Sequence, residues 1–379
     1  THTTDGSDYQ HAMTLIANQP DAAGEIQGAY LRNQMLPALY DNMDSLGYPM
    51  TPYVWPMKKT PDKGIRGFYD SPRYSSGYAS LFQCLSFESE AHMLKPFGVR
   101  VNATLVFFEA MLQVMKAQHK TILETKKSAL EKFIQADTYH TNWVMDTARH
   151  SMIDFMGYEP EYINSPVTNL PLLRYNQEKP YKKSIPYYEF FLPSKTINIP
   201  KAYIIPQAWD DVIERLAING ITYHTFEQDT SLEVSWYNIS GYETYPRIYE
   251  GHYPHYQTEA EPVTGVMHFR AGDVWVDTRQ EGIRFILEML EPECVDSYFN
   301  WNFFDSVLEQ KEYFGEYYFT LLAEEYLKKN PELAAKLRQK QQSDPAFAQN
   351  NRAQLQFIYE NSPYQEPGFM RYPVYRVEE

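Results

Sequence analysis

The sequence predicts an α/β protein with a mixed first part and a second part rich in strands. Within residues 105–133, apolar side chains recur at steps of three and four, which is typical of a long amphipathic helix. After residue 180, short β-branched and aromatic runs alternate with turn residues, which is typical of strands. The length of 379 residues suggests two or three domains. Seven prolines in residues 158–200 favour a boundary there, and we expect domains over 1–180 and 181–379.

The first part contains further periodic segments. Residues 9–16 and 26–36 suggest helices, and the Pro- and Gly-rich residues 47–76 suggest loops. Residues 78–90 form an apolar-rich run that suits a buried strand ending in carboxylates. A second helical pattern covers residues 142–155.

The second part is predicted to contain short strands, a short helix and a helical end. The expected strands cover 187–192, 202–205, 221–226, 232–238, 263–269 and 273–277. The helix spans 209–218 and ends before Gly220, as a helix C-terminus commonly does. Charged helices are expected over 310–329 and 331–342.

Charge and hydropathy exclude several classes of partner. The net charge is 34 − 49 = −15, which argues against nucleic acid and anionic membranes because both attract basic surfaces. We find no apolar run of the ~18–20 residues that a membrane span needs. Cys84 and Cys294 lie 210 positions apart and form no metal or redox motif.

Residue patterns give four candidate sites, each with a structural alternative. His2 precedes an Asp-Gly turn, where a strand could aim an imidazole at a metal, although a lone His is more often structural. Glu90 ends an apolar run, and partial burial would suit it as a general base, although a Glu at the end of a strand is more often simply exposed. The Gly/Pro loop 66–78 carries arginines and tyrosines that could hold a carboxylate, or could simply pack together. His252 and His255 follow Glu250, but Pro254 favours a surface loop over a metal site.

Three of these segments, in chain order, resemble one enzyme family. They are Thr-His-Thr-Thr-Asp-Gly-Ser-Asp-Tyr-Gln (1–10), Asp-Ser-Pro-Arg-Tyr-Ser-Ser-Gly-Tyr-Ala-Ser-Leu-Phe (70–82) and Glu-Ala-His-Met-Leu-Lys-Pro-Phe (90–97). Together they resemble the zinc metallocarboxypeptidases, in particular the long bacterial branch with a β-rich C-terminal region. The resemblance is specific over residues 1–110 and vaguer over 180–379, where residues 271–276, 290–293 and 301–305 are similar to that branch.

The resemblance implies a fold, an activity and residue roles. The fold would be the C-terminal part of a carboxypeptidase-like α/β domain, followed by a β-rich accessory domain with helices. His2 would match the third zinc ligand, and Glu90 would match the glutamate that activates a zinc-bound water and protonates the leaving amine. Tyr69 or Tyr74 would close over a peptide or protein substrate. The family's own carboxylate-binding arginines lie upstream of the third zinc ligand, so Arg73 is a candidate for binding a carboxylate only from the composition of its loop. The resemblance also implies a secreted or periplasmic protein.

The sequence also departs from that family. The family takes its first two zinc ligands from a His-x-x-Glu motif upstream of the third, whereas His2 is the second residue here. The one His-x-x-Glu string, at His224 and Glu227, follows His2 and Glu90, and we interpret it as chance. A catalytic zinc needs about three protein ligands. We therefore expect a C-terminal portion of a zinc hydrolase that is inactive alone.

Two other functions compete with this reading. The aromatic second half could belong to a non-catalytic glycan- or peptide-binding protein with a degenerate peptidase half. A glycoside hydrolase would need two carboxylates flanking a bond. Glu88 and Glu90 lie on the same side of one strand, which does not suit that arrangement.

Overall fold

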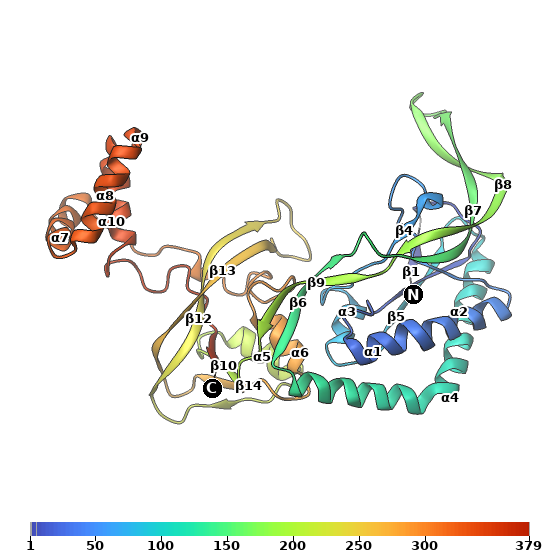
Figure 1. Ribbon diagram of the computed structural model, residues 1–379, viewed down its shortest axis with the longest axis horizontal. Helices are drawn as coiled ribbons and strands as arrows, with labels where there is room; N and C mark the ends of the chain where they lie inside the picture. The colour runs from blue at the N-terminus through green and yellow to red at the C-terminus, as the bar shows by residue number, and fades with distance from the viewer. Residues whose placement is uncertain (1, 5, 379) are drawn as a thin grey trace.

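The computed structural model describes residues 2–4 and 6–378. It is a mixed α/β fold with several sheets, as the sequence predicts. Figure 1 shows two lobes and a separate group of helices: a first lobe in blue to green, a second in yellow to orange, and the helices in red. The predicted boundary at residue 180 lies inside strand β8 (Pro171–Tyr188).

The first lobe is built around a four-stranded mixed sheet with the order β1-β5-β2-β3. Strands β1 and β5 are parallel, β5 and β2 are antiparallel, and β2 and β3 are parallel. Apolar side chains of β2 and β5 form a common core with the neighbouring helices. The strands are β1 (His2–Thr4), β2 (Met13–Ala17), β3 (Thr51–Pro52) and β5 (Phe87–His92), and the helices are α1 (Glu25–Tyr30), η1 (Leu31–Met35), α2 (Leu36–Ser45) and α4 (Phe97–Gln135).

Helix α4 confirms the long helix expected over residues 105–133. The helix expected over residues 9–16 is wrong, because that segment contains strand β2. Leu15 and Met13 alternate with Thr14 and Ile16 across the sheet, and the ladder to β5 outweighs local helical periodicity. Residues 78–90 divide between helix α3 (Ser75–Ser80) and strand β5, so the expected strand is shorter.

Long β-ribbons replace the helix expected over residues 142–155, which is wrong. Strand β6 (Thr138–Met145) pairs antiparallel with β9 (Phe191–Asn198), and β7 (Ser151–Asn164) pairs antiparallel with β8. The segment is rich in aromatic and β-branched residues, and such side chains pack well across strands. In Figure 1, β6 and β9 run between the two lobes, and β7 and β8 extend as a hairpin. The short β4 (Ile65–Arg66) joins β8, following the 3₁₀ turn η2 (Pro61–Lys63).

The second lobe contains a six-stranded sheet with the order β11-β14-β10-β15-β12-β13. The expected strands over 202–205, 232–238, 263–269 and 273–277 are confirmed, although β12 and β13 are longer. The helix expected over 209–218 is confirmed as α5 (Asp210–Ile218). The remaining elements are β10 (Ala202–Ile205), β11 (His224–Thr225), β12 (Thr230–Thr244), β13 (His255–Phe269), β14 (Val274–Asp277), α6 (Ile283–Leu290), η3 (Asp305–Val307) and β15 (Tyr375–Val377).

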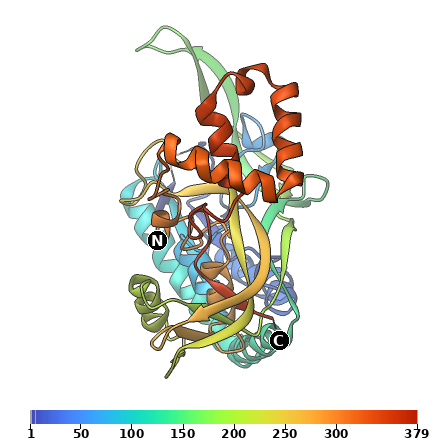
Figure 2. The ribbon, with the colours of Figure 1, turned by 90° about the vertical axis from the view of Figure 1, so that its left-hand side faces the viewer.

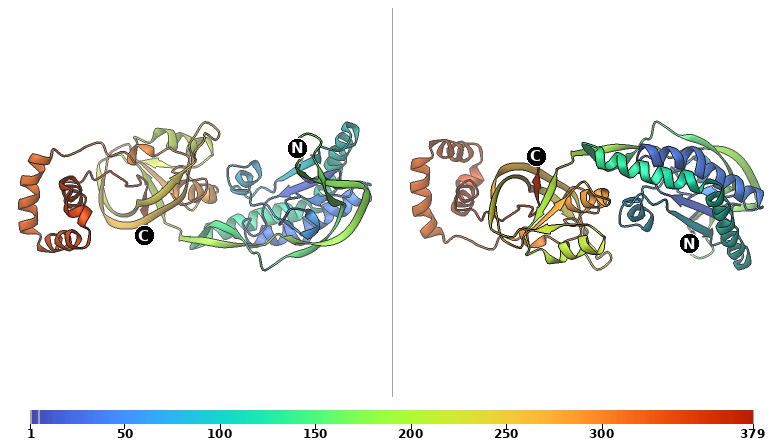
Figure 3. Two further views of the ribbon diagram at one scale, coloured as in Figure 1. Left: turned by 90° about the horizontal axis from the view of Figure 1, so that it is seen from above. Right: turned by 90° about the horizontal axis from the view of Figure 1, so that it is seen from below.

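Four helices form the separate C-terminal group, which stands away from the sheets in Figures 1 and 3 and lies in front of them in the view of Figure 2. They have a core of their own around Phe319, Leu337 and Tyr359. The two charged helices expected here are confirmed as α7 and α8. The group consists of α7 (Glu316–Lys329), α8 (Pro331–Ser343), α9 (Pro345–Ala348) and α10 (Asn351–Glu360).

Candidate functional site

The first lobe brings His2 and Glu90 together. They are register partners in the parallel strands β1 and β5, so their side chains leave the same face of the sheet. His2 Nδ1 lies 3.6 Å from Glu90 Oε1. The His2 side chain is 67% exposed and that of Glu90 is 9% exposed, so an open imidazole stands beside a buried carboxylate.

The surroundings of Glu90 favour its protonated form. Burial raises the pKa of Glu90, the negative charge of Glu88 raises it further, and His2 opposes the shift. Burial also raises the pKa of Tyr9, with a smaller contribution from the Glu90 charge, so the Tyr9 hydroxyl stays neutral near this carboxylate. A carboxyl group whose pKa is raised in this way can exchange protons closer to neutral pH.

A buried histidine supports the strand that carries His2. The ring of His92 is stacked on Tyr9 at 4.1 Å between centroids, and its Nδ1 lies 3.4 Å from the Thr4 carbonyl oxygen. Its Nε2 is 3.2 Å from Asp8 Oδ1 and 3.4 Å from the backbone nitrogen of Tyr9. Burial lowers the pKa of His92. This ring therefore holds β1 and the following turn in place, and both of its nitrogens are engaged within the protein.

The three predicted substrate-binding residues lie in the loop before α3, near the junction of the lobes. Tyr69 lines a small void with Glu288, and burial holds the pKa of its hydroxyl well above the ordinary value. Arg73 forms a salt bridge with Asp296 of the second lobe, at 2.7 Å from Nε to Oδ1. Tyr74 is 40% exposed and packs edge-on against Phe68 at 5.0 Å.

Close backbone packing fixes the shape of this loop. A Cβ atom on Gly77 would lie 2.1 Å from the carbonyl oxygen of Ser71 and 2.3 Å from that of Asp70, so only glycine fits. The backbone N–H of Gln19 donates to Asp70 Oδ1 at 2.9 Å, and burial raises the pKa of Asp70 to about 6. Close packing against the backbone therefore explains why a glycine occupies position 77.

The other histidine motifs occupy the second lobe. His224 and Glu227 flank the end of β11, and the His224 ring is stacked on Trp275 at 5.8 Å. The buried His255 is held by Thr244 Oγ1 and Asp305 Oδ1, each at 2.9 Å. Across residues 2–4 and 6–378, no group of three or more His, Cys, Asp or Glu side chains could hold a metal ion.

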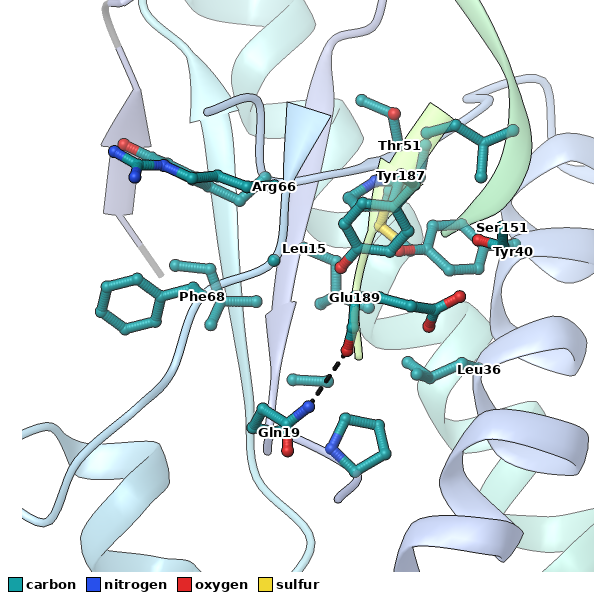
Figure 4. A pocket seen from close by; sticks show the side chains of 18 of the residues that line it. Leu15, Gln19, Leu36, Tyr40, Thr51, Arg66, Phe68, Ser151, Tyr187 and Glu189 are labelled. Atoms are coloured by element: carbon teal, nitrogen blue, oxygen red, sulfur yellow. Dashed lines mark hydrogen bonds between the residues drawn. The ribbon is translucent and has the colours of Figure 1, made fainter. Parts of the chain in front are cut away.

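A separate pocket of about 320 Å³ lies at the opposite edge of the sheet, among α2, β3, β4, β7 and β8 (Figure 4). The buried Thr51 hydroxyl has no hydrogen-bond partner among the described residues. Burial and the nearby Glu189 charge raise the pKa values of Tyr40 and Tyr187, so both hydroxyls stay neutral. Figure 4 shows Tyr187 and Glu189 close together on one wall, and apolar side chains such as Leu15 and Leu36 form other parts of the lining.

The sequence did not predict this pocket, nor the stacking of His92 on Tyr9 that supports strand β1. Thr51 lies 136 residues before Tyr187 (187 − 51), and no local pattern connects Thr51 with Tyr187 and Glu189. The sequence held one signal for the packing of His92 against Tyr9, namely the Asp-Tyr pair at residues 8 and 9, which comes soon after the predicted turn. No protein-family model matches the chain, and no match was found among curated proteins or solved structures.

Proposed function

We propose that this chain forms part of a zinc-dependent, carboxypeptidase-like hydrolase that releases C-terminal residues from peptides. The observation that carries the proposal is the pairing of His2 and Glu90 on adjacent strands, 3.6 Å apart, with the imidazole open and the carboxylate buried. These are the two positions that the resemblance assigns to a zinc ligand and a general base. The finer fold, a carboxypeptidase-like α/β domain with a β-rich accessory domain, belongs to the same proposal.

The donor set around His2 fits only part of a zinc site. His2 would supply one ligand, and its exposure leaves the imidazole accessible. A catalytic zinc takes about three protein ligands, so two would have to come from outside the described residues. When bound, zinc lowers the pKa of its water toward ~7.

Glu90 is the residue that would move the proton. Its carboxylate would accept a proton from the attacking water and release it to the leaving amine, and its raised pKa suits both transfers. Tyr74, with its exposed ring, is the better of the two loop tyrosines for covering a peptide, because Tyr69 is packed beside Glu288. Arg73 would bind a substrate carboxylate only after breaking its salt bridge with Asp296.

A peptide substrate and a location outside the cytoplasm complete the proposal, and both rest on the resemblance alone. The test is to supply the full-length protein that contains this chain with zinc and to follow release of C-terminal residues from a peptide mixture. We expect turnover that Glu90→Gln lowers at least about 10³-fold with zinc content unchanged, because the base is lost and the metal is kept. Equal turnover in the two proteins would reject the assignment.

A ligand-binding protein without catalysis is the second candidate, favoured by the pocket beside α2. Its unpartnered Thr51 hydroxyl, neutral tyrosines and apolar walls are typical of a site for a glycan or a short peptide. Calorimetry with defined oligosaccharides and tripeptides tests this function. We expect Thr51→Val to weaken any binding, whereas Thr196→Val on the exposed ribbon serves as the matched control.

A further inference from the structure

The far end of the β7–β8 hairpin carries apolar side chains into solvent. In Figures 1 and 2 this end rises clear of both lobes. Residues 162–173, which we call the hairpin tip, contain no charged side chain, although 22% of the whole chain is charged. Apolar side chains clustered at an exposed site are typical of interaction surfaces. The large exposed ones of the tip are Tyr162 (59%), Val167 (88%), Leu170 (65%) and Leu172 (46%).

The arms of the hairpin are fixed to the first lobe just below the tip. Glu161 and Arg174 are register partners, and Arg174 Nε donates to Glu161 Oε1 at 2.9 Å. This ion pair marks the lower boundary of the charge-free tip. At the next residue, the Tyr175 hydroxyl donates to Ser7 Oγ at 3.0 Å, so the hairpin is tied to the turn that follows β1. The tip therefore projects from a supported arm.

The turn of the tip satisfies its own backbone N–H groups. The N–H of Ser165 donates to the Leu170 carbonyl, and that of Asn169 donates to the Ser165 carbonyl, both at 2.9 Å. The buried Ser165 hydroxyl accepts the N–H groups of Val167 and Thr168, both at 3.2 Å. The N–H of Leu170 donates to Thr168 Oγ1 at 3.4 Å, and the two prolines of the turn have no N–H. Every N–H from residue 165 to 171 is therefore paired within the turn or absent.

This chemistry favours a lipid bilayer as the occupant. A bilayer has no water to pair with backbone groups, so a segment that enters it must satisfy its N–H groups internally. A specific protein interface normally forms about one hydrogen bond per 100–200 Å². The turn offers a partner protein no free backbone N–H over residues 165–171, and the tip offers it no charge.

The structure also limits how deeply the hairpin enters. Among the residues that the structure describes, β7 and β8 pair only with each other over residues 159–176, so their outer edges are open and need water. Tyr162 stands beside the Glu161–Arg174 pair, at the level where tyrosine prefers the bilayer interface. The exposed Lys59 places its Nζ 5.8 Å from the centre of the Tyr162 ring, where it can reach lipid phosphates. Only the tip is therefore suited to leave water.

Helix α4 and the net charge fit the same picture. By length and composition α4 could cross a membrane, but Ala103, Phe107 and Val114 pack into the core of the first lobe, so α4 is part of the fold. The net charge of −15 repels anionic lipids. Insertion of the apolar tip therefore suits a bilayer whose headgroups are neutral overall.

We propose that the hairpin tip inserts into the surface of a lipid bilayer with zwitterionic headgroups and attaches the first lobe to it. The proposal goes beyond the hydrolase and does not depend on it. Attachment by a few apolar side chains is weak and reversible. Because burial of apolar surface drives it, added salt should leave it nearly unchanged.

Flotation of the chain with phosphatidylcholine vesicles tests the proposal. We expect the chain to float with the vesicles, and the double variant Val167→Asp/Leu170→Asp to lower the partition coefficient at least 30-fold. The matched control is Ile248→Asp/Val266→Asp on the other long hairpin, β12–β13, where the exposed fractions are 63% and 70%. This control should change the partition coefficient less than threefold, with circular dichroism showing that both variants are folded.

A second variant tests the closed turn separately. Ser165→Ala keeps every apolar side chain but leaves the N–H groups of Val167 and Thr168 without their acceptor. We expect the partition coefficient to fall at least fivefold, because these groups would enter the bilayer unpaired. Ser184→Ala, at an exposed serine on the same strand outside the tip, is the control and should have no effect. Equal partition of the two serine variants would overturn the proposal.

Other results would also reject insertion of the tip. One is a folded protein that does not float with phosphatidylcholine vesicles, and another is an equal loss of flotation in the two double variants. Flotation that disappears in about 0.5 M salt would assign binding to charged groups instead of the tip. Sedimentation that reveals a dimer dissociated by Val167→Asp would assign the tip to a second copy of the chain.

Discussion

Arg73 and Asp296, 223 residues apart in the chain, connect the two lobes through both backbone and side chain. The backbone N–H of Arg73 donates to Asp296 Oδ2 at 2.9 Å, and Arg73 Nε donates to Oδ1 at 2.7 Å. The guanidinium also lies over the rings of Tyr249 and Trp301, at 5.5 and 5.4 Å from their centroids. Both charged side chains are largely buried, so the pair holds the loop that precedes α3 against the second lobe.

Replacing Arg73 by alanine should destabilise the fold. The change leaves the buried Asp296 without its cation, and removing one partner of a buried pair costs about 3 kcal/mol or more. Urea unfolding measures the loss. The matched control is Arg174→Ala, which removes an exposed pair with Glu161 and should cost less than about 1 kcal/mol. Equal losses in the two variants would show that the lobes do not depend on Arg73.

Gly77→Ala should also destabilise the loop, by about 2 kcal/mol or more, because the new methyl group overlaps two backbone oxygens. Gly98→Ala is the control: the space around Gly98 is open, and alanine favours helix α4, so stability should change by less than about 1 kcal/mol. Thermal unfolding of both variants tests the prediction. A Gly77→Ala protein as stable as Gly98→Ala would contradict the close packing around α3.

Glu288→Gln should change how stability depends on pH. Burial raises the pKa of Glu288 to about 7, so its contribution to stability is complete below its ordinary pKa of 4.5 and is lost as pH rises through 7. The glutamine variant avoids this loss. Between pH 4 and pH 8, the free energy of unfolding of the variant should rise by about 3 kcal/mol relative to that of the parent. The reason is that one pKa unit corresponds to about 1.4 kcal/mol. Urea unfolding at the two pH values measures the difference, and a constant difference would refute it.

Glu90→Gln should raise the melting temperature at pH 7 and leave it nearly unchanged at pH 4. The reason is again a pKa raised by burial, so ionisation of Glu90 disfavours the folded state as pH rises above its ordinary range. Glu88→Gln tests whether the effect is specific, because Glu88 lies in the same strand. If Glu90→Gln instead lowers the melting temperature at pH 7, its pairing with His2 outweighs the cost of burial.

The sequence by itself determined the mixed α/β class, the long α4, the short α5 and the helices α7 and α8. These elements follow from local periodicity and end signals, which depend only on neighbouring residues. The assignment of residues 9–16 and 142–155 was decided by tertiary structure, because a strand is stabilised by partners distant in the chain. His2 and Glu90 could be named from the sequence, but their register, the burial of Glu90 and the engagement of Arg73 with Asp296 could not. Those relations exist only once segments up to 223 residues apart have packed together.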